Sequence, residues 1–256
     1  MLENTFLHLP LIGPKTEINL WRQGILTWDE LELHLHHWPS NSQNRRLMKS
    51  RLQESRENRD QAAYFHEILP PSERWRLYRD FQHSCVFLDI ETTGITIYGH
   101  EITVIGLYDG QHTHHYINGQ NMDEFEDALE SYDLLVTFNG SRFDLPFITS
   151  FFRNLQLRQA HIDLLHVVRR LGYRGGLKSI EPLFGIARSP EIQEMSGYEA
   201  VVLWHQYRQG STDALQKLLL YNEADVVNLK TIMDTVWERL QRELEFEAGR
   251  LLPFNL

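Results

Sequence analysis

Residues 85–94 read CVFLDIETTG, an apolar run that ends in two carboxylates and a glycine. A short, β-rich apolar run of this kind predicts a strand that is buried on both faces. Asp89 and Glu91 stand two residues apart, so both side chains would point to the same side of that strand. Two buried carboxylates repel each other unless a cation or a proton relieves the repulsion. The alternative is that the strand ends at Leu88 and both acids are solvated.

The residues around this strand have the pattern of an α/β domain. Strands are expected at 85–91, 101–110, 112–119, 133–139 and at the start of 161–172, with a hairpin turn at Asp109-Gly110. Helices are expected at 122–131, from about Phe143 onward, in the rest of 161–172, and over most of the remaining C-terminal residues. This order predicts a mixed sheet that is flanked by helices.

The first 80 residues are predicted to form a separate helical domain, with the second domain at 81–256. Segment 6–35 resembles one helix-hairpin-helix unit, in which backbone N–H groups bind a phosphate. Leu11 stands where that motif has its first glycine, and Gly13, Lys15 and Thr16 are the candidate contacts. The alternative is that this segment is only a structural cap.

Residues 40–80 are rich in arginine and predict a solvated helix or helix pair that ends before the two prolines at 70–71. A run of cations in this segment would also suit contacts along a phosphate backbone. These cations are Arg45, Arg46, Lys49 and Arg51.

The overall composition limits the class of protein. The 256 residues contain one cysteine and carry a formal net charge of −10. A single cysteine excludes an intramolecular disulfide and a Cys-rich zinc site. Because no apolar run is long enough to span a membrane, we expect a soluble, cytoplasmic protein with no membrane contact. The negative charge argues against a simple electropositive coat protein for nucleic acid.

Two further polar motifs follow the first strand. In Asn139-Gly-Ser-Arg-Phe-Asp144, a strand ends, a glycine-containing turn follows, and Asp144 stands at the start of a helix. Alone, Asp144 is explained equally well as an acid that stabilises the helix dipole. In Tyr221-Asn-Glu-Ala-Asp225, the tyrosine and the aspartate share one face of a long helix. Alone, Tyr221 is explained equally well as a core residue with a solvated hydroxyl.

Taken together, DIETTG, NGSRFDLPFI and YNEAD resemble the three motifs of the DEDD superfamily of 3′→5′ exonucleases. The chain is similar to the YprB-type domains of that superfamily from about residue 84 to residue 235, and FDLPFI is similar to the proofreading domains of family B DNA polymerases. The resemblance implies a ribonuclease-H-like (DnaQ-like exonuclease) fold with a mixed five-stranded sheet. Because position 220 is leucine rather than histidine, the resemblance is to the tyrosine subclass, DEDDy.

The resemblance also implies a mechanism. Asp89, Glu91, Asp144 and Asp225 would bind two divalent cations, Mg²⁺ or Mn²⁺, and Tyr221 would orient the attacking water. The products would be nucleoside 5′-monophosphates. The expected substrate-binding residues are Thr92, Thr93, Asn139, Phe143 and Lys178.

Several alternatives remain open. The expected partners are the 3′ ends of single-stranded DNA or RNA, with DNA and a role in DNA repair favoured over RNA trimming. A phosphodiesterase that cleaves dinucleotides would use the same metals, and an inactive nucleic-acid-binding module would be expected to have lost some of the acids. His112 and His114 would share one strand face, but no third zinc ligand is evident near them. The sequence identifies no protein partner.

Overall fold

The computed structural model of the chain describes residues 1–249 and 252. They divide into two compact units, one of Met1–His83 with Trp237–Leu256 and one of Ser84–Val236. The last helix, Thr212–Ala248, passes from the second unit into the first. The domain boundary at residue 80 stays a prediction. No described helix is long and apolar enough to cross a membrane.

The second unit contains a five-stranded mixed sheet, as predicted. Its strands are β1 (Cys85–Thr92), β2 (Ile102–Tyr108), β3 (Thr113–Ile117), β4 (Leu134–Thr137) and β5 (Ala160–Asp163), in the order β3-β2-β1-β4-β5. β1 pairs antiparallel with β2 and parallel with β4. The predicted turn joins β2 to β3, and Oδ1 of Asp109 accepts the N–H groups of Gln111 and His112, both at 2.7 Å.

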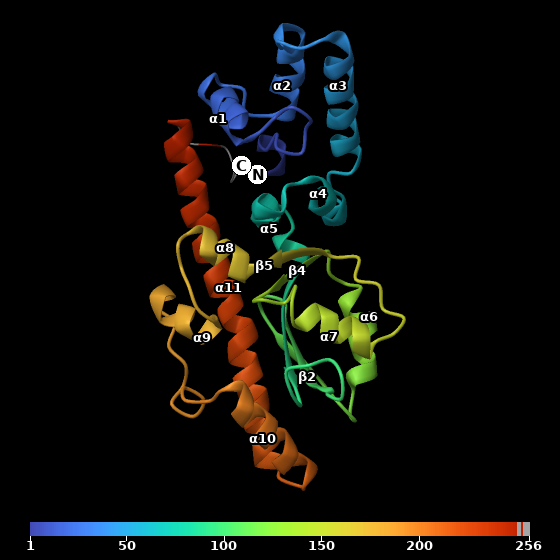
Figure 1. The fold of residues 1–256 in the computed structure, drawn as a ribbon, viewed down its shortest axis with the longest axis vertical. Coiled ribbons are helices and arrows are strands. Elements are labelled where there is room, and N and C mark those ends of the chain that lie inside the picture. Colours follow the sequence, from blue (N-terminus) through green and yellow to red (C-terminus); the bar gives the residue numbers. More distant parts are fainter. Residues whose placement is uncertain (250–251, 253–256) are drawn as a thin grey trace. The chain divides into compact units, whose positions relative to one another are not determined.

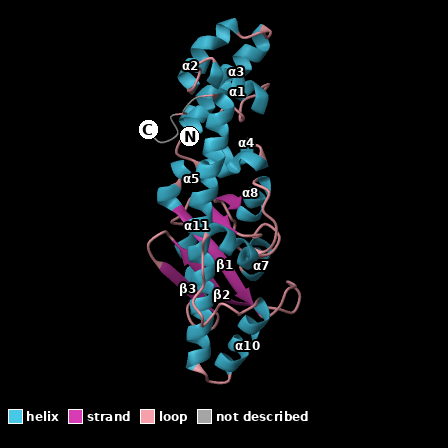
Figure 2. Cartoon of the chain, turned by 90° about the vertical axis from the view of Figure 1, so that its left-hand side faces the viewer, coloured by secondary structure: helices cyan, strands magenta, loops and turns pink. Residues whose placement is uncertain are grey.

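Helices cover both faces of this sheet. They are α6 (Phe125–Leu129), α7 (Asp144–Phe151), α8 (Leu164–Arg170), α9 (Leu177–Ile180), α10 (Gly197–Arg208) and α11 (Thr212–Ala248), with 3-10 turns at Met122–Glu124 and Glu181–Phe184. α6 and α7 lie on one side of the sheet and α11 lies on the other (Figures 1 and 2).

The alternation of side chains along β1 decides which residues face which layer. Val86, Leu88 and Ile90 belong to the core that contains Phe125 and Phe147 of α6 and α7. The residues that alternate with them, including Asp89 and Glu91, therefore face the α11 side of the sheet. This explains how a strand with a buried apolar face also presents two carboxylates to a site.

The first unit is helical. Its helices are α1 (Pro14–Arg22), α2 (Trp28–His34), α3 (Ser42–Glu57), α4 (Ala62–Ile68) and α5 (Leu77–Asp80), with 3-10 turns at Leu2–Asn4, Leu35–His37, Pro71–Arg76 and Gln82–Ser84. Its core holds a buried arginine, Arg76, whose Nη1 lies 2.9 Å from Oε2 of Glu17 and whose Nε lies 2.8 Å from Oε2 of Glu73. Pairing of this kind is what allows charged groups to be buried.

Candidate active site

The site begins on β1. Asp89 stands opposite Gly106 of β2, and Glu91 stands opposite Val104. Glu91 is buried and Asp89 is partly buried. Nδ2 of Asn222, on α11, donates to Oδ2 of Asp89 at 3.1 Å, so this carboxylate is oriented by the helix that covers it.

Asp144, the first residue of α7, is brought against the same strand. Its Oδ1 accepts the N–H of Ile90 at 3.1 Å, and the side chain is 3% exposed. Asp144 does stand in the first turn of α7, as the helix-dipole alternative requires, but its side chain is buried against β1 rather than solvated. The pKa of Asp144 is raised to about 7, mainly by burial. The nearby carboxylates of Asp163 and Asp225 contribute to the rise, and two backbone hydrogen bonds oppose it.

The turn before Asp144 is held by Asp163, at the end of β5. Its carboxylate accepts the N–H of Asn139 at 2.7 Å, the N–H of Ser141 at 3.1 Å and the hydroxyl of Ser141 at 2.5 Å. Gly140 is required here because a Cβ atom would lie 2.2 Å from Oγ1 of Thr137. Asp163 also caps α8 by accepting the N–H of Leu165.

Tyr221 and Asp225 enter the site from one face of α11, and both are buried. Asp89, Glu91 and Asp225 each offer a carboxylate oxygen, and the three oxygens lie within 4.8 Å of one another. Among the described residues, this is the one group of three or more acids, histidines or cysteines with such geometry. Oxygen ligands at this density suit a hard divalent cation.

The electrostatics follow from this crowding. Burial raises the pKa of Asp89 and of Glu91, and repulsion from Asp225 and Asp144 raises both pKa values further. Burial raises the pKa of Asp225 to about 6, although the guanidinium of Arg188 opposes the shift. The carboxylates therefore ionise less readily than free ones, and a bound cation would favour their ionised form.

Two cationic side chains lie beside Tyr221. Nζ of Lys178 is 4.5 Å from the centroid of the Tyr221 ring, and Cζ of Arg188 is 5.3 Å from it. Lys178 was expected in the site, whereas Arg188 and its partner Glu181 were not. The available signal was the position of these two opposite charges inside the apolar run IEPLFGIAR, where unpaired charges are rare.

The other predicted substrate-binding residues have contacts within the chain. The hydroxyl of Thr92 donates to the carbonyl of Gly94 at 2.6 Å, and the hydroxyl of Thr93 accepts the N–H of Glu101 at 2.9 Å. Asn139 adopts the left-handed backbone conformation, with φ 66°. Phe143 packs against the core on the α6 and α7 side, with its ring 4.9 Å from that of Phe147. Their roles toward a substrate stay predictions.

Two other candidates from the sequence have a definite local structure. His112 and His114 lie 3.9 and 4.0 Å from Oδ2 of Asp109, and the described residues place no three-ligand zinc group there. In the segment that resembles a helix-hairpin-helix, Leu11 adopts φ 69°, the conformation that a glycine would favour, and Gly13 is the N-cap of α1.

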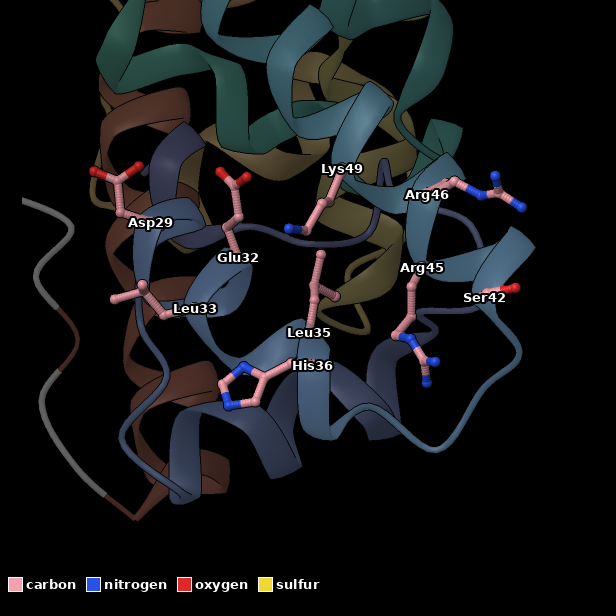
Figure 3. Close-up of a pocket in the computed structure, with 9 residues that line it drawn as sticks. All are labelled: Asp29, Glu32, Leu33, Leu35, His36, Ser42, Arg45, Arg46 and Lys49. Carbon is pink, nitrogen blue, oxygen red and sulfur yellow. The ribbon is translucent and has the colours of Figure 1, made fainter.

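A hollow of about 1000 Å³ lies in the first unit between α2 and α3 (Figure 3). Its lining residues are Asp29, Glu32, Leu33, Leu35, His36, Ser42, Arg45, Arg46 and Lys49. Asp29 and Glu32 pair with Arg56 at 2.7 and 2.8 Å. Lys49 extends toward α2, whereas Arg46 extends in the opposite direction (Figure 3). Since these cations do not converge, a role in binding a phosphate backbone stays a prediction.

Comparison with known proteins shows which family the chain belongs to. No curated protein matches the chain. Among solved structures, the family B DNA polymerase of the archaeon Pyrobaculum calidifontis has a TM-score of 0.50 at 13% identity, over 67% of this chain and 26% of the polymerase. Brucella melitensis NrnC bound to pGG has a TM-score of 0.45 at 21% identity, over 67% of this chain and 81% of NrnC. NrnC with bound Mg²⁺ has a TM-score of 0.43 at 19% identity, over 68% of this chain and 86% of NrnC.

At 13% identity, the likeness to the polymerase concerns the fold alone, and the chain spans about a quarter of the polymerase's length. The family model of the RNase_H superfamily matches residues 86–237. This range includes the whole five-stranded sheet except the first residue of β1. Since this match extends over more than half of the sequence, the chain belongs to the RNase H superfamily.

Proposed function

We propose that the chain is a metal-dependent 3′→5′ exonuclease of the DEDDy type, which hydrolyses single-stranded nucleic acid to nucleoside 5′-monophosphates. One observation carries the proposal. Four carboxylates from a strand, the start of one helix and the middle of another gather beside Tyr221, and the pKa of each is raised. Because raised pKa values of this kind are costly to maintain, such clusters are typical of functional sites.

The donor set fits divalent cations. All four candidate ligands are carboxylates, and their mutual repulsion is what a cation would relieve. Asp89, Glu91, Asp144 and Asp225 would hold Mg²⁺ or Mn²⁺. When two such ions are bound, they supply a water of lowered pKa and neutralise charge on the leaving oxygen.

Tyr221 would act as a hydrogen-bond donor rather than as a base. Burial raises the pKa of its hydroxyl, and the charges of Asp225 and Glu91 raise it further. The hydroxyl therefore stays protonated at neutral pH. In that state it would hold the attacking water in line with the scissile bond, and general-base chemistry by this side chain is not required.

Lys178 is the best supported of the predicted substrate-binding residues. Its ammonium group is buried and has no hydrogen-bond partner among the described residues. Burial and the neighbouring Arg188 lower its pKa. A phosphate oxygen would satisfy this ammonium. Thr92, Thr93, Asn139 and Phe143 stay proposed contacts for the terminal nucleotide, with Phe143 offering part of its ring for stacking.

DNA is the favoured substrate, because the FDLPFI segment is similar to proofreading domains. A 3′→5′ exoribonuclease is the second candidate, and a dinucleotide phosphodiesterase is the third. An inactive binding module is disfavoured because all four acids and Tyr221 are present, and Asp89, Glu91 and Asp225 bring carboxylate oxygens within 4.8 Å of one another.

The test is a time course on 5′-labelled DNA, RNA and dinucleotides with Mg²⁺ or Mn²⁺. Wild type is expected to shorten the labelled strand stepwise from its 3′ end, and Asp144→Asn is expected to lose this activity. Asp127→Asn, at an exposed acid of α6, is the matched control and should behave as wild type. The relative rates on the three substrates rank the candidates. The absence of metal-dependent cleavage of all three would refute the proposal.

A further inference from the structure

Arg188 is buried in the candidate site, where it pairs with two acidic side chains. Its side chain is 4% exposed. Nε and Nη2 donate to the two oxygens of Glu181, at 2.7 and 2.6 Å, and Nη2 also donates to Oδ1 of Asp225. Paired hydrogen bonds from a planar guanidinium to one carboxylate fix its orientation as well as its position.

Glu181 is in turn fixed by α11. Nδ2 of Asn228 donates to its Oε1 at 2.9 Å, and the residue is 2% exposed. Both oxygens of Glu181 are therefore engaged by Arg188, and one is engaged by Asn228 as well. A buried glutamate with these contacts holds the guanidinium in place rather than serving as a free ligand.

This arrangement leaves one group of the guanidinium unused. Nη1 of Arg188 is buried and has no hydrogen-bond partner among the described residues. A buried cationic N–H group without an acceptor is destabilising, and native structures retain few of them. An acceptor supplied by a ligand would remove this cost.

The position of Nη1 limits what that ligand can be. The guanidinium lies against the ring of Tyr221, and the ammonium of Lys178 lies against the same ring and also has no hydrogen-bond partner among the described residues. Two such donors suit an anion with several acceptor oxygens. A phosphate group has this chemistry, and arginine binds it with particular geometric specificity.

We propose that Arg188 binds the reacting phosphate through Nη1, and that Glu181 is its positioning residue. The identity of this phosphate as the reacting one rests on the proposed function. Arg188 would then contact charge that develops during cleavage. The competing explanation is that Arg188 only neutralises and holds Asp225.

The direct test measures phosphate recognition without hydrolysis. Calorimetry in Mn²⁺ compares the affinity of the full chain for deoxyadenosine 5′-monophosphate with its affinity for deoxyadenosine. Wild type is expected to prefer the monophosphate, and Arg188→Gln to weaken its binding at least about 10-fold while the nucleoside is unaffected. Equal weakening of both compounds, or no preference in wild type, overturns the proposal.

Metal affinity separates the two roles of Arg188. If Arg188 binds phosphate, removing it should leave Mn²⁺ affinity unchanged or tighter, because a cation that competes for Asp225 is lost. The same variant should lower kcat/KM by about 10²-fold or more, as for other donors to transition-state charge. A loss of Mn²⁺ affinity that accounts for the whole loss of activity would support the structural role instead and overturn the proposal.

Folding controls are available in the chain. Arg188→Gln leaves Glu181 buried without its cation, which is destabilising. The double variant Glu181→Gln with Arg188→Gln removes both charges, and should keep the fold while losing the preference for the monophosphate. Arg169→Gln, at an exposed arginine of α8, is the matched control and should retain that preference.

The two proposals can fail separately. If wild type cleaves no substrate but prefers the monophosphate through Arg188, the exonuclease proposal fails and phosphate binding stands. If wild type cleaves nucleic acid and Arg188→Gln does so at the same rate, only the role of Arg188 is lost.

Discussion

Asn222 donates a hydrogen bond from Nδ2 to Oδ2 of Asp89, across 3.1 Å between helix α11 and strand β1. Asn222 is completely buried, and the residue opposite Asp89 on β2 is Gly106. A Cβ atom on Gly106 would lie 2.1 Å from Oδ1 of Asn222. The absence of a side chain at Gly106 therefore allows α11 to approach the sheet closely enough to orient a candidate metal ligand.

Gly106→Ala is expected to damage the site and the fold together. The added methyl group must displace Asn222, and overpacking of this kind costs about 1–3 kcal/mol. We expect a lower free energy of unfolding for the second unit and a loss of activity, measured by denaturant titration and by the oligonucleotide assay. Gly197→Ala is the control, because a Cβ atom there meets nothing within 4 Å. Equal behaviour of the two variants would show that the close approach is unimportant.

Tyr221→Phe is expected to bind the metal ions as wild type does, but to lose most of its catalytic activity. The hydroxyl stays protonated because its pKa is raised, so its removal takes away a donor and no charge. We expect kcat to fall about 10²-fold, in the range of a lost donor or proton-transfer group, while Mn²⁺ affinity stays as in wild type. Tyr198→Phe on α10, where the side chain is exposed, serves as the control. A parallel loss of Mn²⁺ affinity would contradict the assignment.

Stabilisation by a divalent cation is expected to grow with pH. The pKa of Asp144 is about 7 and that of Asp225 about 6, both raised above their ordinary value of 3.8. These two groups contribute their whole stabilisation of the folded state below about pH 4. This stabilisation is lost as the pH rises through about 6 to 7, because the carboxylates of the folded chain must then ionise.

A cation that binds the ionised carboxylates reverses this loss. The rise in Tm on adding Mn²⁺ should therefore be larger at about pH 8 than at about pH 5. Thermal denaturation with and without Mn²⁺ measures it. Asp144→Asn should reduce both the rise and its pH dependence. A rise in Tm of the same size at both pH values would count against these pKa shifts.

The parts of the site that the sequence predicted are those that local geometry determines. Asp89 and Glu91 share a strand face because side chains alternate, and Tyr221 and Asp225 share a helix face because of their spacing. The fold followed from the order of apolar runs and from the resemblance of the three motifs. Charge pairs between distant residues could not be predicted in this way.

Glu17 illustrates the limit. Its place on α1 fits an exposed acid in a first helical turn, yet it is 1% exposed and pairs with Arg76, 59 residues later. The pairing of Arg188 with Asp225, 37 residues later, was missed for the same reason. A local pattern determines which face of an element is apolar, but the partner of a charge depends on how separate elements pack.

Asp163→Ala is expected to disturb the loop before Asp144. The carboxylate accepts hydrogen bonds from Asn139, Ser141 and Leu165, so its removal leaves several N–H groups without an acceptor. Loss of a charged acceptor and helix cap costs about 2–3 kcal/mol. Chemical denaturation should detect this loss, with Asp127→Ala on α6 as an exposed control. Wild-type stability of Asp163→Ala would mean that the loop is held by other contacts.

His8→Leu is expected to make the first unit less sensitive to acid. His8 is 8% exposed, its ring lies 5.4 Å from that of Trp28 and 6.0 Å from that of Phe65, and neither ring nitrogen has a hydrogen-bond partner among the described residues. Burial lowers its pKa from 6.5 to about 3. The unfolded chain therefore binds a proton that the folded chain rejects between these values, and stability falls as the pH drops below about 6.5.

The size and sign of this effect can be measured. At about pH 5 the unprotonated, buried imidazole lowers the unfolding free energy of wild type by about 2 kcal/mol, since each unit of pKa shift is worth about 1.4 kcal/mol. Leucine does not titrate and has no such effect. The gap in unfolding free energy between His8→Leu and wild type should widen by that amount from about pH 7.5 to about pH 5. Tryptophan fluorescence follows this unit well, because it holds all but one of the six tryptophans: Trp21, Trp28, Trp38, Trp75 and Trp237. His83→Leu, at an exposed histidine, controls for the loss of a ring. A gap that stays constant with pH would mean that His8 gains a proton in the folded unit, and that the unit opens around it.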